Sequence, residues 1–178
     1  MGMGADVANR RFRHRLAVLV VLGVALFAAV GARGLLAPVA LADHVIKGCT
    51  VVDHPTREHY TKCSGHDLSH ANLSSVDLSY ADLHSVDLSS ANLLNANLGG
   101  TNLDWADLSE ADLRRANLSR ASLDHAEAYA ANLSGADLMN ADLEGADLLD
   151  ADWSHANLTG ARLCHTVGPK GNEINRDC

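Results

Sequence analysis

A leucine recurs every five residues from Leu68 to Leu163, and this interval constrains the fold more than any other feature of the chain. Twenty five-residue repeats share this central position, which departs from leucine only at Ala128 and Trp153. The residue two before the centre is Ala in sixteen repeats, and the residue immediately before it is Asp or Asn in seventeen. A pattern this regular predicts one repeated structural unit.

An interval of five fits neither of the regular secondary structures. In an α-helix, at about 100° per residue, successive leucines would be rotated by roughly 140° and would spread around the helix. In an uninterrupted strand, side chains alternate with a period of two, so an odd interval would send the leucines to opposite faces in turn. The pattern is satisfied if each repeat is a short extended piece, with its Ala and Leu pointing inward, followed by a corner.

The residues that follow each leucine suit such a corner. Ser, Gly, Asn, Asp and His dominate there, as in Ser74-Ser75 and Gly99-Gly100, and these residue types accept tight turns. Successive corners would wind the chain into a coil. Repeats this short cannot bury a core alone, so they are stabilised by stacking. The sequence therefore predicts a solenoid.

Residues 66–163 resemble the pentapeptide repeat family, whose motif is a run of A(D/N)LXX units. The resemblance covers more than half of the chain. It implies an all-β fold, a right-handed quadrilateral β-helix with four repeats per coil and with the central Leu and the preceding Ala inside. Twenty repeats would make about five coils, and with about 4.8 Å between stacked strands the rod would be roughly 24 Å long.

Residues 1–42 have the features of a secretory signal peptide. Four arginines between residues 10 and 15 precede an apolar run at 16–30, and a second apolar stretch ends in Ala-Leu-Ala at 40–42. This order of basic, apolar and small residues is typical of signal peptides. We therefore expect cleavage after residue 42, no membrane span in the mature chain, and a location outside the cell or in the cell envelope. The alternative is an uncleaved signal anchor, which the short apolar run disfavours.

The expected mature chain is acidic. Without residues 1–42 it carries nine basic and twenty-one acidic residues, a net charge of about −12, compared with −8 for the whole chain. An acidic surface disfavours nucleic acid and anionic lipid as partners. We expect a protein partner, and the repeat pattern specifies neither that partner nor an oligomeric state.

Four cysteines flank the repeats in two pairs, each pair fourteen residues apart. Four cysteines allow three connectivities. If the rod has the length that the resemblance implies, no bond can join its ends, because bridged Cα atoms lie about 4.4 to 6.8 Å apart. We therefore expect Cys49 to pair with Cys63 and Cys164 with Cys178, closing caps at 43–65 and 164–178, since a solenoid exposes unpaired edges at its ends. Export makes oxidation of these cysteines expected.

Sorting the outward positions at intervals of twenty residues, one expected coil, gives two acidic columns. Like charges on neighbouring strands are destabilising, so the columns need an explanation. In one interpretation Asp suits the corner and the carboxylates are simply solvated. In the other, the columns form an interaction face for a basic partner or for Ca²⁺. The first column is Asp67, Asp87, Asp107, Glu127 and Asp147, and the second is Asp104, Asp124 and Glu144.

The chain contains no nucleophile elbow, Walker motif or HExxH sequence, so we expect no enzyme, no catalytic residue, no cofactor and no dedicated metal site. The leading expectation is a non-enzymatic exported scaffold or protein-interaction module. The resemblance also implies an alternative, because the quinolone-resistance branch of the family consists of acidic β-helices that mimic DNA and bind gyrase. A cation-binding protein that uses the acidic columns is the third possibility.

Overall fold

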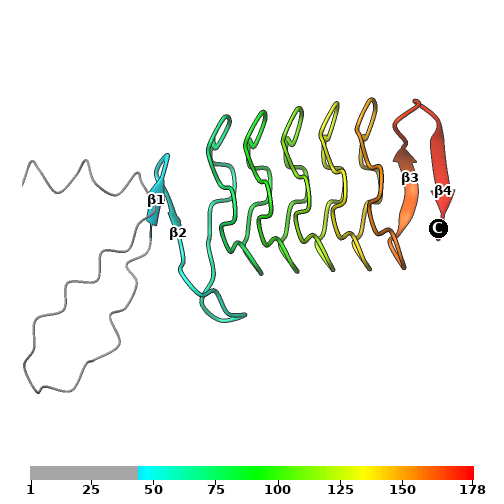
Figure 1. Cartoon of the computed structure of the whole chain (residues 1–178). Coiled ribbons are helices and arrows are strands. Elements are labelled where there is room, and N and C mark those ends of the chain that lie inside the picture. Colours follow the sequence, from blue (N-terminus) through cyan, green and yellow to red (C-terminus); the bar gives the residue numbers. More distant parts are fainter. Residues whose placement is uncertain (1–43) are drawn as a thin grey trace, which may run out of the picture. The chain divides into compact units, whose positions relative to one another are not determined.

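A computed structural model describes residues 44–178 of the chain. The predicted signal peptide, residues 1–42, lies outside the described residues. From residue 44 to the C-terminus the chain forms short coils stacked between two small hairpins (Figure 1). Within these residues, no helix has the length and apolar character needed to cross a membrane.

Parallel bridges between residues twenty apart hold the coils together. Eighteen such bridges run along the stack, from Lys62 paired with Asp82 to Asp147 paired with Val167. Because twenty residues are four repeats, each repeat forms one side of a four-sided coil. The ladder extends one step beyond the repeats counted from the leucines at each end, to Lys62 and to Val167. At the N-terminal end this is because the buried Cys63 occupies a central leucine position, and at the C-terminal end Val167 belongs to the strand that begins at Leu163.

The central leucines and the alanines two residues before them fill the interior. From Leu68 to Leu148 every central residue is at most 3% exposed. Where Thr replaces the inward Ala, its hydroxyl finds a partner, since Thr101 Oγ1 donates to the Leu78 carbonyl at 2.7 Å. At the C-terminal end of the stack, Trp153 is half-buried and packs against the core.

A β-turn follows each central residue from Leu68 to Leu158. In the turn after Leu68, for example, the N–H of Ala71 donates to the Leu68 carbonyl at 3.0 Å, and the residue between Ser69 and Ala71 has a φ of 56°. A positive φ at the third residue is the pattern of a type II turn, which favours Gly and Asn. The corner is also bonded to the next coil, because the N–H of His70 donates to the Ser89 carbonyl at 2.9 Å.

The Asp or Asn before each leucine has a local structural cause. In all seventeen repeats that carry Asp or Asn, its Oδ1 accepts a hydrogen bond from the backbone N–H two residues later, as from Ser69 to Asp67 at 2.9 Å. This is the geometry of an Asx turn, and it stabilises the start of the corner. Asn serves this purpose as well as Asp, so the turn accounts for the residue type but not for the charge of the acidic columns.

Ala128 interrupts a column of leucines. It lies between Leu108 and Leu148 along the stack and is 2% exposed. The backbone stays regular around it, with 2.6 Å from Leu108 N to Glu127 O and 2.7 Å from Ala128 N to Asp147 O. Tyr129 is 45% exposed. Neither a bulge nor the tyrosine ring therefore replaces the missing leucine carbons.

A hairpin covers each end of the stack. Strand β1 (His44–Ile46) pairs antiparallel with β2 (Cys49–Val51) at the N-terminal end. Strand β3 (Leu163–Val167) pairs antiparallel with β4 (Glu173–Arg176) at the C-terminal end. These hairpins occupy the ends at which the first and last coils would otherwise expose unpaired backbone.

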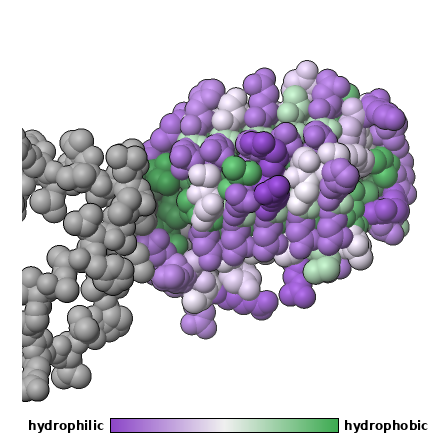
Figure 2. Space-filling view, viewed as in Figure 1, coloured by the Kyte–Doolittle hydropathy of each residue, from purple (hydrophilic) through white to green (hydrophobic). Residues whose placement is uncertain are grey.

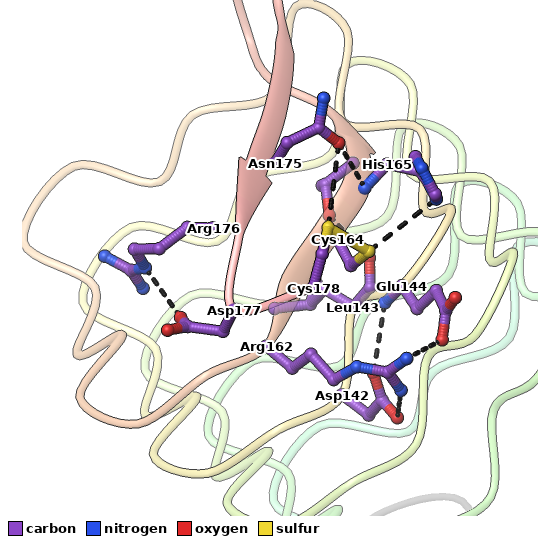
Figure 3. Close-up of a disulfide and its surroundings, with 11 residues drawn as sticks. Asp142, Leu143, Glu144, Arg162, Cys164, His165, Asn175, Arg176, Asp177 and Cys178 are labelled. Carbon is purple, nitrogen blue, oxygen red and sulfur yellow. Dashed lines mark hydrogen bonds and ion pairs between the residues drawn. A yellow bond between two sulfur atoms is a disulfide. The ribbon is translucent and has the colours of Figure 1, made fainter.

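A disulfide ties each hairpin region together. Cys49 is bonded to Cys63 with a Cα–Cα distance of 5.5 Å, and both belong to the hydrophobic core. Cys164 of β3 is bonded to Cys178 with a Cα–Cα distance of 4.9 Å (Figure 3). This is the connectivity that the rod length predicted.

Candidate interaction surface

The two acidic columns lie on either side of one corner of the coil. The five members of the first column form one continuous ladder, since Asp67 bridges to Asp87 and each member bridges to the next. The second column occupies the corner position that ends the preceding side of the coil, and Trp105 and His125 lie between the two columns. We call this surface the acidic corner. Its members are Asp67, Asp87, Asp107, Glu127, Asp147, Asp104, Asp124, Glu144, Trp105 and His125.

Trp105 is the most exposed aromatic residue of the acidic corner. It is 57% exposed, and its ring stacks on that of His125 with 4.3 Å between the centroids and 25° between the planes. The His125 ring in turn lies against Gly145, where a Cβ would come within 2.5 Å of Nδ1. Gly145 has a φ of 63°, so glycine at this position provides both the turn conformation and the space for the ring.

One carboxylate at each end of the acidic corner pairs with a basic residue, and the middle of the corner stays charged. Lys47 Nζ lies 3.2 Å from Asp67 Oδ1 at the N-terminal end. Arg162 pairs with Glu144 at the C-terminal end, as Figure 3 shows. In the part of the chain that the structure describes, no Lys or Arg pairs with Asp107 or Glu127. Negative charge is therefore concentrated beside Trp105.

Hydrogen bonds from the next coil hold the carboxylate of Asp104 in the second column. Asp104 Oδ1 accepts from Ser122 Oγ at 2.5 Å and from the backbone N–H of Asp124 at 3.2 Å. Asp124 Oδ1 lies 3.8 Å from His125 Nε2, which is beyond hydrogen-bond distance. These contacts orient the Asp104 carboxylate on the surface next to Trp105.

Three aspartates of the stack are held in their charged form. Hydrogen bonds from the Ser69 side chain and backbone, and from Lys47, lower the pKa of Asp67 to about 2. The Arg114 side chain lowers the pKa of Asp112 through a two-pronged hydrogen bond, with 2.7 Å to Oδ1 and 2.6 Å to Oδ2. Hydrogen bonds from the Ser154 backbone and side chain lower the pKa of Asp152.

The direction of these shifts predicts how stability depends on pH. A carboxyl whose pKa is lower in the folded state stabilises the fold above its unfolded pKa of about 4, and this contribution is lost as the pH falls toward the folded value. We expect the melting temperature to be nearly constant from about pH 7 to 5 and to fall below about pH 4. Thermal unfolding followed by circular dichroism at several pH values tests this. The variant Asp112→Asn should lose less stability in acid, and a melting temperature that rises below pH 4 would contradict the prediction.

The acidic corner does not form a compact metal site. In residues 44–178, the one group of three or more His, Cys, Asp or Glu whose ligand atoms lie within 4.8 Å of one another is Cys164, His165 and Cys178. Both cysteines of that group are in a disulfide. The carboxylates of the two columns are spaced along the rod, and in the first column Asp67, Asp87, Asp107 and Asp147 each use Oδ1 in an Asx turn.

A protein-family model described as "Pentapeptide repeats" matches this chain in eight copies, over residues 67–104, 101–138 and 136–166. The chain belongs to the pentapeptide repeat family. Members of this family fold as right-handed quadrilateral β-helices, and the twenty-residue register of the stack agrees with that fold. The resemblance to this family that the A(D/N)LXX repeats carry is confirmed.

Solved pentapeptide repeat structures resemble parts of this chain. HetL, which is involved in heterocyst differentiation regulation in the cyanobacterium Nostoc sp. strain PCC 7120, is 30% identical over 64% of this chain and 62% of its own, with a TM-score of 0.46. A protein from the Arabidopsis thaliana thylakoid lumen is 35% identical over 57% of this chain and 64% of its own, with a TM-score of 0.33. The chain thus spans less than two thirds of each.

A more distant structure is that of QnrB1, a plasmid-mediated fluoroquinolone resistance protein. It is 20% identical over 59% of this chain and 69% of its own, with a TM-score of 0.34. No match was found among curated proteins.

The columns read from the sequence did not include Trp105 and His125. Both residues occupy the second corner position, where turn-forming residues are ordinary, and they lie twenty residues apart. Sorting this corner position by coil, as was done for the acidic residues, would have placed the two rings next to each other. The signal was therefore present in the spacing.

Proposed function

We propose that this pentapeptide repeat protein is a non-enzymatic, exported interaction module of about five coils that binds a basic protein partner through the acidic corner. Trp105 is the observation that carries the proposal. It is an exposed aromatic ring, 57% accessible, placed where the carboxylates lack basic partners among residues 44–178. Trp residues surrounded by charged residues are frequent binding-energy hot spots in protein interfaces.

The rigidity of the surface supports this role. The carboxylates and the Trp105–His125 stack are carried by a backbone whose corners are bonded to the next coil, as in the 2.9 Å bond from Trp105 N to Asp124 O. A preformed surface loses little conformational freedom on binding. The outer face shown in Figure 2 is mostly hydrophilic, as expected for a partner that is recognised by charge around a few apolar contacts.

Site-specific photo-cross-linking tests the proposal. A photoreactive amino acid at position 105 of the full chain, expressed in its own host, should yield one discrete adduct with a basic protein. The matched control is position 115, because Arg115 occupies the second corner position of the same coil on another corner, with a φ of 57° compared with 60° at Trp105. Adducts at both positions, or at neither, would count against the proposal.

Affinity for the cross-linked partner gives a second measurement. Trp105→Ala should weaken binding by tenfold or more, about the effect of losing an aromatic hot spot. Asp107→Asn and Glu127→Gln should slow association and reduce its dependence on salt. Variants that bind like the wild type would remove the acidic corner from the interface.

Export is tested separately by cell fractionation with N-terminal sequencing. The proposal expects a chain that starts at Asp43 outside the cytoplasm. Retention in the cytosol, together with inhibition of gyrase supercoiling by the purified protein, would favour the DNA-mimic alternative. Calorimetric titration with Ca²⁺ tests the cation-binding alternative, which the wide spacing of the carboxylates does not support.

A further inference from the structure

A hollow of about 490 Å³ lies at the corner that precedes the side of the coil leading to Trp105. Its lining includes two arginines, Arg57 from the N-terminal cap and Arg120 from the stack, and it contains no carboxylate. The chain as a whole carries 22 acidic and 14 basic residues, so this local excess of positive charge runs against its composition. The charge of the lining favours an anionic ligand.

Gly99 and Gly100 create the hollow. Tyr80, Gly100 and Arg120 occupy the same corner position in three successive coils. Because the middle coil has glycines at this corner, no side chain projects there between Tyr80 and Arg120. The Tyr80 ring leans over Gly100, where a Cβ would lie 3.1 Å from a ring carbon. Two coil spacings, roughly 10 Å, separate the backbones of Tyr80 and Arg120. The Tyr80 ring takes up part of this gap, and the hollow that remains beside it is the space available to a ligand.

Side-chain amides form the floor of the hollow. Asn117 Nδ2 donates to Asn97 Oδ1 at 2.9 Å, and a Cβ at Gly99 would lie 3.2 Å from Asn117 Nδ2. Because Gly99 has no side chain, these amides are not covered. Each amide nitrogen carries two hydrogens, and the Asn ladder uses one of them. The floor therefore offers further hydrogen bonds to a ligand.

The two guanidinium groups are available to an anion. Among residues 44–178, neither Arg57 nor Arg120 pairs with a carboxylate. The Arg57 guanidinium lies 5.5 Å from the centroid of the Tyr80 ring, a cation–π contact that holds it at the edge of the hollow. Guanidinium groups bind carboxylates and sulfates through paired hydrogen bonds.

We propose that this hollow binds an acidic saccharide unit. The guanidinium groups of Arg57 and Arg120 take its carboxylate or sulfate, the amides of Asn97 and Asn117 take its hydroxyls, and the Tyr80 ring contacts its C–H surface. The volume lies in the range of small-molecule sites, about 300–1,000 Å³. This site is separate from the acidic corner and does not depend on the protein partner proposed there.

A peptide strand suits this hollow less well. Binding by strand addition needs free backbone groups, and those of the corner are already used, with 3.0 Å from Tyr80 N to Gly99 O and 2.9 Å from Gly100 N to Ser119 O. A ligand must therefore be held by side chains. Hydroxyl groups around an anionic centre match the side chains that are present.

Isothermal titration of the oxidised protein with trigalacturonate tests the proposal. We expect saturable binding that weakens as NaCl is added. Arg57→Gln and Arg120→Gln should each lower the affinity about tenfold, the effect of losing one charge-assisted hydrogen-bonding group. Tyr80→Leu should lower the affinity for trigalacturonate while leaving any weak binding of inorganic sulfate unchanged.

Arg115→Gln is the matched control, because Arg115 is an exposed corner arginine that does not line the hollow. It should bind trigalacturonate like the wild type, and neutral maltotriose should not bind. Three results would each overturn the proposal: equal binding of maltotriose, tighter binding of triglutamate than of trigalacturonate, or unchanged affinity in both the Arg57 and the Arg120 variants. Trp105→Ala leaves the hollow intact, so its effect on the protein partner is measured independently.

Discussion

Substituting Leu113 by Ala should lower the free energy of unfolding by about 2–5 kcal/mol. Leu113 is 0% exposed and lies between Leu93 and Leu133 in one column of the interior. The backbone on both sides is held by regular ladder bonds, such as the 2.8 Å bond from Leu113 N to Asn132 O, so the stack cannot close over the missing carbons. Urea unfolding followed by circular dichroism measures the change.

Position in the stack provides the control for this prediction. Leu158 occupies the same place in its repeat but is only half-buried in the last coil, so Leu158→Ala should cost clearly less than Leu113→Ala. Ala128→Leu should have the opposite sign and stabilise by about 1 kcal/mol, because it adds buried apolar carbons at the one position between Leu108 and Leu148 where the leucine column is interrupted. Equal losses at Leu113 and Leu158, or a destabilised Ala128→Leu variant, would show that the interior packs differently.

The fold could be predicted because the five-residue interval in the sequence is also the length of one side of each coil. A leucine every fifth residue excludes a helix and a straight strand, and the bridges between residues twenty apart put the central leucines from Leu68 to Leu148 inside. The number of sides per coil came from the family resemblance, since a period of five does not by itself specify four corners. The Asx turns explain why the residue before each leucine is Asp or Asn. Because Asn serves the turn as well as Asp, they do not decide between the two interpretations of the acidic columns.

The candidate sites were less predictable, for physical reasons that differ between them. The acidic columns follow the repeat and could be read from the sequence, but the neutralisation of Glu144 depends on Arg162, one coil away. The anionic-ligand hollow depends on Arg57, which a capping segment without any repeat brings next to Tyr80. The repeat period predicts the positions of residues that recur in every unit. The candidate sites depend on residues that depart from the repeat or lie outside it.

Removing the C-terminal disulfide should have the second large effect. In Cys164→Ser/Cys178→Ser the unfolded chain gains the freedom of a loop of about 15 residues, worth roughly 3 kcal/mol in the chain-entropy model. Strand β4 is largely exposed, and Ile174 is its one residue packed against the core. We therefore expect β4 to detach from β3 before the coils unfold. Urea unfolding and amide hydrogen exchange of residues 163–178 measure the two effects.

The N-terminal disulfide gives the comparison that separates a local from a global effect. Cys49 and Cys63 close a loop of the same length, yet both are buried in the core, at 1% and 0% exposure. Cys49→Ser/Cys63→Ser should therefore add a packing penalty to the loss of the bond and open the first coil, while exchange in β4 stays as in the wild type. Because stacked repeats contact only their neighbours, each loss should be confined to its own end. If either double variant accelerated exchange along the whole stack, the coils would be unfolding as one unit, and the hairpins would be part of a single cooperative structure rather than independent caps.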